Sequence, residues 1–137
     1  MFPRSLLPYL LITISTLAAQ GRKEWIVDQS GGPGHDFRQI THAIPRVKDG
    51  DLIHVRPGSY DGFRLDRLGI SLLGTGRVII TGTTISNLPA KRETVLRGVQ
   101  FVTAPLIVPR LEIINCQGRV TLDDVRCTGA PESSAAL

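Results

Sequence analysis

The chain contains 137 residues, which is enough for a single domain and too few for two. Hydrophobic residues make up 42% of the chain and charged residues 20%, so the composition excludes an intrinsically disordered protein and allows a buried core. The 14 glycines and 9 prolines favour many turns over long helices. Because only 5% of the residues are aromatic, the core must consist mainly of Ile, Leu and Val, which suit short strands.

The formal net charge is +4, and 13 of the 16 basic residues are arginines. Arginine can hold a carboxylate or a phosphate with two parallel hydrogen bonds, which lysine cannot. The arginines are scattered singly, and ordinary solubility with local pairing to the 12 acidic residues accounts for most of them. The sequence has no clustered basic run with interleaved aromatic residues, so we expect no nucleic-acid partner.

Residues 1–19 have the pattern of a secretory signal peptide. Arg4 precedes an apolar run from Leu6 to Leu17, and the small residues Ala18 and Ala19 offer cleavage positions. The apolar run is too short to span a bilayer, which needs about 20 residues. We therefore expect an exported protein, secreted or periplasmic, without a membrane span and in a compartment that permits disulfides.

Residues 36–47 predict a short amphipathic helix. Asp36 is the expected N-cap, and Gln39 three residues later completes a capping box. The apolar residues at helical spacing are Phe37, Ile40, Ala43, Ile44 and Val47. Pro45 lacks an amide donor and clashes with the preceding turn, so the helix should end or kink near Ala43 or Ile44.

Short strands are predicted on both sides of this helix. Trp25-Ile26-Val27 is an apolar run before it. After an Asp-Gly turn, Ile53 and Val55 alternate with polar residues as far as Pro57, and further short runs follow between glycine-containing turns. This pattern indicates an all-β protein that opens with a capping helix.

Four motifs between Trp25 and Gly76 carry a resemblance to a known family: W-I-V-D, D-F-R-Q-I-T-H-A-I-P, D-G-D-L-I-H-V-R-P-G-S-Y and I-S-L-L-G-T-G. They resemble the opening of pectin methylesterases and other pectin-lyase-like proteins, in which a capping helix precedes a right-handed parallel β-helix. The resemblance implies the same fold here, with the helix closing one end of the stack. Pectin methylesterases carry their catalytic groups in later motifs such as G-T-V-D-F-I-F-G, which this chain lacks, so no catalytic residue is transferred.

An internal repeat favours a stack of similar rungs. Two alignments define it: Thr94–Phe101 with Val120–Cys127 at an offset of 26, and Leu111–Gly118 with Leu122–Gly129 at an offset of 11. An offset of 26 suits one rung, which is one complete turn of a β-helix, and would stack Leu96 on Leu122. An offset of 11 suits the passage from one face of the β-helix to the next. We therefore predict a right-handed parallel β-helix of about four rungs over residues 20–130.

The aligned segments share the template Leu-x-x-(Ile or Val)-x-(Cys or Phe). The second apolar residue falls at an odd offset, whereas a continuous strand needs an even one, so the strand must break once at a corner. Gly98, or Asp124 in the matching place, can supply a left-handed corner residue. Ile113 occupies this place in the third copy and fits that conformation poorly.

Asp123 and Asp124 are the only adjacent carboxylates in the chain. The repeat places Arg97 beside Asp123, and Glu112 one face away completes a candidate polar site. The site could bind a cation or work as an acid and base, or it could be a polar corner without chemistry. Consecutive strand residues point to opposite faces, so the two aspartates can share a site only across a corner.

No metal or cofactor is predicted. His35, His42 and His54 lack metal-ligand spacing, and the two cysteines form no C-x-x-C motif. Cys116 and Cys127 occupy matching inward places in the template. They are either two buried thiols or a disulfide across the interior.

Three functions remain open from the sequence. The first is a non-catalytic module that holds acidic polysaccharide on arginine-bearing faces, and the second is a truncated or diverged pectin-esterase-like or lyase-like enzyme. The third is a structural unit that assembles through an open end. Residues 131–137 are predicted to be a disordered tail rather than a second cap, so the last rung should expose apolar core and unpaired backbone, and we expect self-association there.

Overall fold

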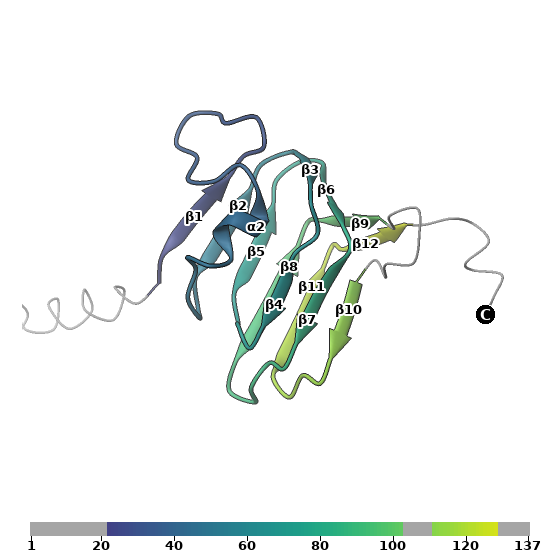
Figure 1. Cartoon of the computed structure of the whole chain (residues 1–137). Helices are drawn as coiled ribbons and strands as arrows, with labels where there is room; N and C mark the ends of the chain where they lie inside the picture. Colours follow the sequence, from purple (N-terminus) through teal and green to yellow (C-terminus); the bar gives the residue numbers. More distant parts are fainter. Residues whose placement is uncertain (1–21, 103–110, 129–137) are drawn as a thin grey trace, which may run out of the picture.

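The computed structural model describes residues 22–102 and 111–128, and these fold into three parallel β-sheets (Figure 1). The expected all-β class is therefore confirmed. The predicted signal peptide over residues 1–19 and the predicted tail over residues 131–137 lie outside the described residues.

The three sheets are named A, B and C in the order in which the chain visits them. Sheet A contains β1 (Glu24–Val27), β2 (Leu52–Val55), β5 (Ser71–Gly74), β8 (Glu93–Arg97) and β11 (Arg119–Asp123). Sheet B contains β3 (Gly58–Tyr60), β6 (Val78–Thr81), β9 (Gln100–Val102) and β12 (Arg126–Thr128). Sheet C contains β4 (Arg64–Asp66), β7 (Thr83–Ser86) and β10 (Leu111–Ile114).

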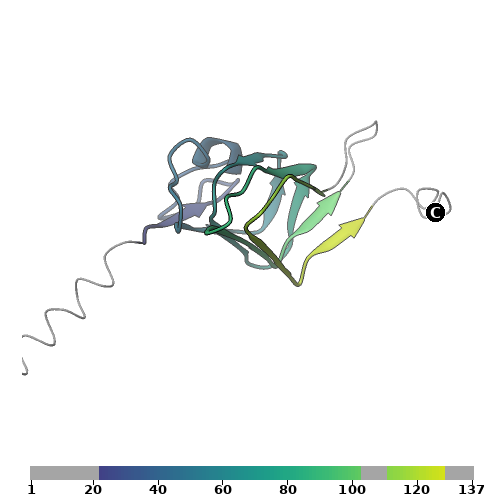
Figure 2. The ribbon, with the colours of Figure 1, turned by 90° about the horizontal axis from the view of Figure 1, so that it is seen from below.

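The chain passes through sheets A, B and C in turn and then begins again, which divides the strands into layers. Layer 1 is β2, β3 and β4, layer 2 is β5, β6 and β7, layer 3 is β8, β9 and β10, and layer 4 is β11 and β12. Each strand pairs in parallel with the equivalent strand of the next layer. Seen from below, the sheets form different sides of the fold, and β11 turns sharply into β12 (Figure 2).

Inward side chains stack in columns, one column for each sheet, because paired residues of parallel strands face the same way. On sheet A, Ile53 pairs with Leu72, Leu72 with Leu96, and Leu96 with Leu122, and the last of these pairs is the one that the repeat predicts. The equivalent column on sheet B is Tyr60, Ile80, Phe101 and Cys127, and on sheet C it is Leu65, Ile85 and Ile113. Members of the columns in layers 1–3 are almost fully buried wherever a further strand follows them.

The helix is shorter than the sequence predicts: α2 spans Ile40–Ala43, whereas the apolar stripe predicts a helix over 36–47. Ile40 and Ala43 are fully buried in the main core, so α2 covers the layer 1 end. The helix ends at Ala43 as expected from Pro45, and Ile44 is its C-cap.

The predicted capping box is wrong. The N-cap of α2 is Gln39, and no side chain caps the helix. The Asp36 carboxylate instead accepts a hydrogen bond from the Ile26 amide at 2.8 Å, and Phe37 forms a parallel bridge with Val27. Pairing with β1 keeps these residues extended, so they cannot enter the helix.

The repeat at an offset of 26 is confirmed by the register of β8 with β11 and of β9 with β12. The predicted corner residues Gly98 and Asp124 have φ angles of 70° and 51°, in the left-handed region. The alignment at an offset of 11 does not place equivalent corners. Ile113 is a strand residue, and the corner lies at Asn115, whose φ is 51°.

A second set of left-handed corners follows the strands of sheet C. Arg67, Asn87 and Asn115 occupy it, with φ angles of 60°, 56° and 51°. The Asn115 amide donates to Asn87 Oδ1 at 2.9 Å, and the Asn87 amide donates to Asp66 Oδ1 at 2.7 Å. This ladder of side chains joins layers 1, 2 and 3 at one corner, which explains why asparagine occurs there.

Candidate functional site

The candidate site lies at the corner between sheets A and B, where layer 2 turns more widely than layers 3 and 4. Leu72 pairs with Leu96 and Ile80 with Phe101, so residues 73–79 of layer 2 span the same distance as residues 97–100 of layer 3. Layer 2 therefore has three extra residues at this corner. They project from the stack and leave a hollow beside the tight corners of layers 3 and 4.

Glycine is required at the tight corner of layer 3. A Cβ atom at Gly98 would lie 2.7 Å from the Gly74 carbonyl oxygen, and its φ of 70° already disfavours any side chain. Gly76 in the wide corner also has a φ of 70°, and a Cβ atom there would lie 2.8 Å from Pro57 Cγ. The absence of side chains at Gly76 and Gly98 leaves the hollow open between the layers.

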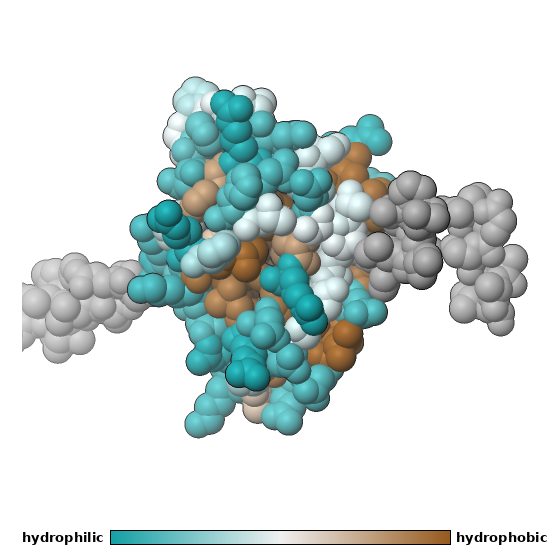
Figure 3. Space-filling view, viewed as in Figure 1, coloured by the Kyte–Doolittle hydropathy of each residue, from teal (hydrophilic) through white to brown (hydrophobic). Residues whose placement is uncertain are grey.

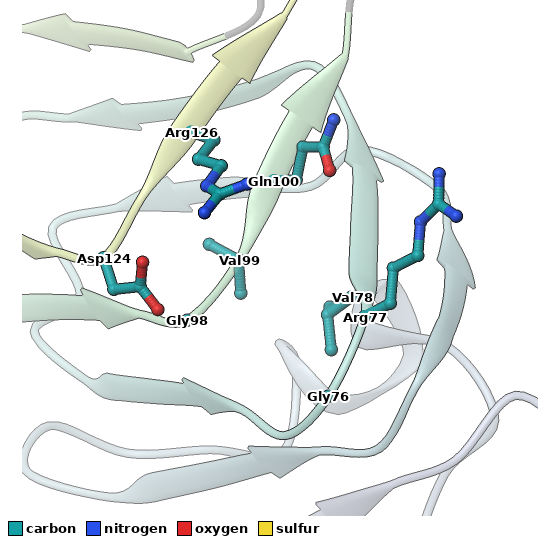
Figure 4. Close-up of a pocket in the computed structure, with 8 residues that line it drawn as sticks. All are labelled: Gly76, Arg77, Val78, Gly98, Val99, Gln100, Asp124 and Arg126. Carbon is teal, nitrogen blue, oxygen red and sulfur yellow. The ribbon is translucent and has the colours of Figure 1, made fainter.

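The hollow, which we call the corner groove, has a volume of about 440 Å³ (Figure 4). Its lining residues are Gly76, Arg77, Val78, Gly98, Val99, Gln100, Asp124 and Arg126. Arg77 comes from the wide corner, whereas Gln100 and Arg126 are cross-strand partners at the starts of β9 and β12. The groove therefore combines two guanidinium groups, one carboxamide and one carboxylate, contributed by three successive layers.

Arg77 and Arg126 are not paired with any carboxylate among residues 22–102 and 111–128. Three described arginines are neutralised: Arg56 pairs with Asp28 at 3.1 Å, Arg97 with Asp123 at 2.8 Å, and Arg92 with Asp49. The groove arginines thus keep their donors for an external acceptor. The Gln100 amide donates to Thr128 Oγ1 at 3.1 Å, which fixes the carboxamide along sheet B.

The structure brings together only part of the predicted polar site. Arg97 and Asp123 form an ion pair, but their side chains are 57% and 54% exposed, so the pair contributes at most about 1 kcal/mol to stability. Asp124 is the corner residue and lines the groove. Glu112 lies on β10 in sheet C, opposite Thr84, and so belongs to a different sheet from the aspartates.

Arg77, Gln100 and Arg126 are absent from the predicted polar site. The signal for Arg77 is its place directly after Gly76 in the G-T-G-R segment, between two apolar runs, which marks a wide corner carrying a charge. Gln100 and Arg126 align at the offset of 26, and their equivalence could have been drawn from the repeat. The depth of the groove depends on the difference in corner length between layers, which the sequence alone does not reveal.

Cys116 and Cys127 are both free thiols. Cys116 belongs to the edge of the main core, while Cys127 continues the sheet B column above Phe101 and is exposed. Cys127 is exposed although it belongs to the inward column, because no further strand among the described residues follows β12 in sheet B. Among the described residues, no group of three or more His, Cys, Asp and Glu side chains could hold a metal ion.

The most strongly shifted carboxyl group is structural. Hydrogen bonds from the Ser30 side chain and then from Arg56 lower the pKa of Asp28 to about 2, and the Ser30 and Gly32 amides add to the effect. Asp28 is buried and organises the loop that follows β1. Nearby, the Tyr60 hydroxyl donates to the Arg56 carbonyl at 2.7 Å and accepts from the Gln29 amide at 3.1 Å, so this cluster holds the loop against layer 1.

Three other hollows are less suited to an anion. One, of about 480 Å³, lies beside α2 and is lined mainly by apolar groups, including Ile44, Pro45 and Phe63 (Figure 3). Another, of about 570 Å³, contains Lys91, Arg92 and Arg119 beside Glu93, and Arg92 is neutralised by Asp49. A third, of about 500 Å³, contains Arg22, Lys91 and Arg92 together with the carboxylates of Asp49 and Glu93. Among these hollows, the corner groove is the one whose lining includes two arginines without a carboxylate partner among the described residues.

Comparisons of the chain with protein-family models, with curated proteins and with solved structures found no match. In the part of the chain that the structure describes, no helix has the length and apolar character needed to cross a membrane.

Proposed function

We propose that the protein is an exported right-handed parallel β-helix that binds acidic polysaccharide without catalysis, and that the corner groove is its binding site. The observation that carries this proposal is the pair of arginines, Arg77 and Arg126, which line one groove without a carboxylate partner among the described residues.

Several observations support the fold and compartment in this proposal. The chain visits sheets A, B and C in the same order in each layer, and connections between parallel strands are right-handed in about 98% of known cases. The apolar run before Ala18 and Ala19 supports export. The resemblance of Trp25–Gly76 to pectin-lyase-like proteins agrees with this fold and with a carbohydrate partner.

The chemistry of the groove suits a polymer of uronic acids. A guanidinium group can form two parallel hydrogen bonds with one carboxylate, and the carboxamide of Gln100 can bind sugar hydroxyls. Layers of a sheet repeat every 4.7–4.9 Å or so, and Gln100 and Arg126 lie in adjacent layers. Donors from successive layers therefore form a row that an extended, negatively charged chain can follow.

The same lining argues against glycoside hydrolysis in the groove. Glycoside hydrolysis requires two carboxyl groups on either side of the scissile bond, and the groove lining contains one, Asp124. Asp123 does not line the groove and forms an ion pair with Arg97 instead. The adjacent aspartates thus act as an ion-pair partner and a corner residue, and the groove lining lacks the second carboxyl group that glycoside hydrolysis needs.

The proposal is tested by calorimetric titration of the purified protein with oligogalacturonate. We expect binding that weakens as salt is added, and each of Arg77→Ala and Arg126→Ala should weaken it about tenfold, or about 1.4 kcal/mol. Arg46→Ala is the matched control, because it removes the same charge from an exposed position in the turn after α2. The control should bind as the unmodified protein does.

Two results would contradict the proposal. Equal losses in all three variants would mean that net charge, and not the groove, attracts the ligand. Turnover of methylated or plain pectin that is abolished by Asp123→Ala or Asp124→Ala would support the enzyme instead. Fully methyl-esterified oligomers should bind weakly, since they lack the carboxylates that the arginines hold.

A further inference from the structure

Among the described residues, layer 4 and strand β10 of layer 3 leave apolar side chains and strand edges uncovered. Leu122 is 45% exposed and Ile113 44%, although their partners in layer 3 and layer 2, Leu96 and Ile85, are fully buried. Strands β10, β11 and β12 are each the last strand of their sheet among the described residues. In Figure 3 a hydrophobic patch lies over β10, at the lower right of the view. An uncovered edge strand is a template for pairing with another strand.

The β11 strand is self-complementary. Its sequence is Arg119-Val120-Thr121-Leu122-Asp123. If it is placed antiparallel to a second copy of itself and centred on Thr121, then Arg119 lies opposite Asp123, Val120 opposite Leu122, and threonine opposite threonine. Every cross-strand pair is then favourable: opposite charges, two apolar residues, and two hydroxyl-bearing β-formers.

The backbone of β11 agrees with this alignment. The Arg119 amide donates to the Arg92 carbonyl at 3.1 Å, and the Asp123 carbonyl accepts from the Gly98 amide at 3.1 Å, so these residues direct their backbone groups towards β8. Val120 and Leu122 alternate with them and direct their amides and carbonyls to the open edge. An antiparallel pair centred on Thr121 makes Val120 and the second copy's Leu122 the residues that exchange hydrogen bonds.

We propose that two copies of this chain associate through layer 4, with β11 pairing antiparallel to β11 of the second copy about a two-fold axis at Thr121. The same rotation covers Leu122 of each copy and brings the edge of β12 towards the edge of β10 of the other. The interface is isologous, because one surface serves both partners and the assembly closes as a dimer. The charge pattern of β11 favours a second copy over an unrelated strand.

This interface does not depend on the proposed sugar-binding function. Asp123 already pairs with Arg97 within its own chain, and a carboxylate has acceptor capacity for a second guanidinium group. In the dimer, Asp123 lies between its own Arg97 and Arg119 of the second copy. Two such clusters form in each dimer, related by the two-fold axis.

The experiment is a charge exchange followed by analytical ultracentrifugation over a wide range of protein concentration. The unmodified protein should be a dimer that dissociates on dilution. Arg119→Asp and Asp123→Arg should each place two like-charge pairs in the homodimer and weaken it about tenfold or more. An equimolar mixture of these two variants should recover dimers, because every β11 contact in the mixed dimer joins opposite charges. Arg64→Asp, at an exposed position on β4 in layer 1, is the control and should leave the dimer unchanged.

Recovery in the mixture separates a direct contact from damage to the fold, since two misfolded variants would not restore each other. A protein that stays monomeric at every concentration would overturn the proposal. So would a dimer that both single variants leave intact, because association would then use another surface. A mixture that fails to recover, with both variants folded by circular dichroism, would also overturn it.

Discussion

Replacing Gly98 by alanine should destabilise the protein through the contact between successive layers at the A–B corner. Gly98 has a φ of 70°, and a left-handed conformation costs a residue with a Cβ atom about 1–2 kcal/mol. The new Cβ atom would also lie 2.7 Å from the Gly74 carbonyl oxygen, which is backbone and cannot move aside alone. Overpacking of this kind adds about 1–3 kcal/mol. The expected loss in the free energy of unfolding is therefore about 2–5 kcal/mol.

The matched control is Gly50→Ala. Gly50 also has a left-handed φ, of 86°, but a Cβ atom there meets nothing within 4 Å. Gly50→Ala should lower the free energy of unfolding by only about 1–2 kcal/mol, so the difference between the two variants isolates the contact between the layers. Urea titration followed by circular dichroism measures both losses, provided that the slope with urea is unchanged. Equal losses in the two variants would refute the stacking of Gly74 on Gly98.

Three further outcomes are expected. Asn87→Gly keeps a residue suited to the left-handed φ of 56° but loses two exposed side-chain hydrogen bonds, to Asp66 and Asn115. Urea titration should therefore show that the free energy of unfolding falls by about 1 kcal/mol. Asn87→Ala should lower it by about 1–2 kcal/mol more, because alanine disfavours the left-handed conformation. Folding lowers the pKa of Asp28 from 3.8 to about 2, so its contribution to stability is present above pH 4 or so and is lost as pH falls towards 2. The urea midpoints of the unmodified protein and of Asp28→Asn should therefore converge as the pH is lowered over that range. A constant difference between the two midpoints would contradict the assignment. In Asp124→Asn, asparagine can adopt the same left-handed corner, and the substitution removes a negative charge from the groove. Calorimetry should then show that oligogalacturonate binds about two- to fivefold more tightly. Weaker binding would mean that Asp124 contacts the ligand.

The layers were only partly visible in the sequence, because the corners differ in length. Layers 3 and 4 share a two-residue corner between sheets A and B, so one offset of 26 relates both sheets and the repeat is detectable. Between layers 2 and 3 the offset is 24 at Leu72 with Leu96 and 21 at Ile80 with Phe101. Insertions at corners therefore remove the fixed period that a repeat search needs, while the stacked strands keep their register.

The errors at the start of the chain have a similar origin. Asp36 has a side chain suited to an N-cap, but in the fold its carboxylate accepts a hydrogen bond from the Ile26 amide of β1 instead. Phe37 has the spacing of the apolar helical stripe, but an apolar residue also suits the parallel bridge that it forms with Val27. Local sequence patterns state which partners a residue can take, and tertiary pairing decides among them.

The candidate site was predictable at one residue, Asp124, since its left-handed corner followed from the repeat. Arg77 and Arg126 lie 49 positions apart in the chain (126 − 77) and line one groove only because layers 2 and 4 turn at the same corner. Their lack of carboxylate partners is a property of the folded chain. It depends on which arginines Asp28, Asp49 and Asp123 neutralise.

The most direct test of acidic-polysaccharide binding at the corner groove is a nuclear magnetic resonance titration of the ¹⁵N-labelled protein with oligogalacturonate. Amide shifts that grow with ligand and saturate are expected at Gly76–Val78, at Gly98–Gln100 and at Asp124 and Arg126, which line the groove. The shifts should be reversed by salt, because guanidinium–carboxylate pairs in an open groove are screened. Saturating shifts confined to other residues, or no shifts at any ligand concentration, would contradict the assignment of this groove as the binding site.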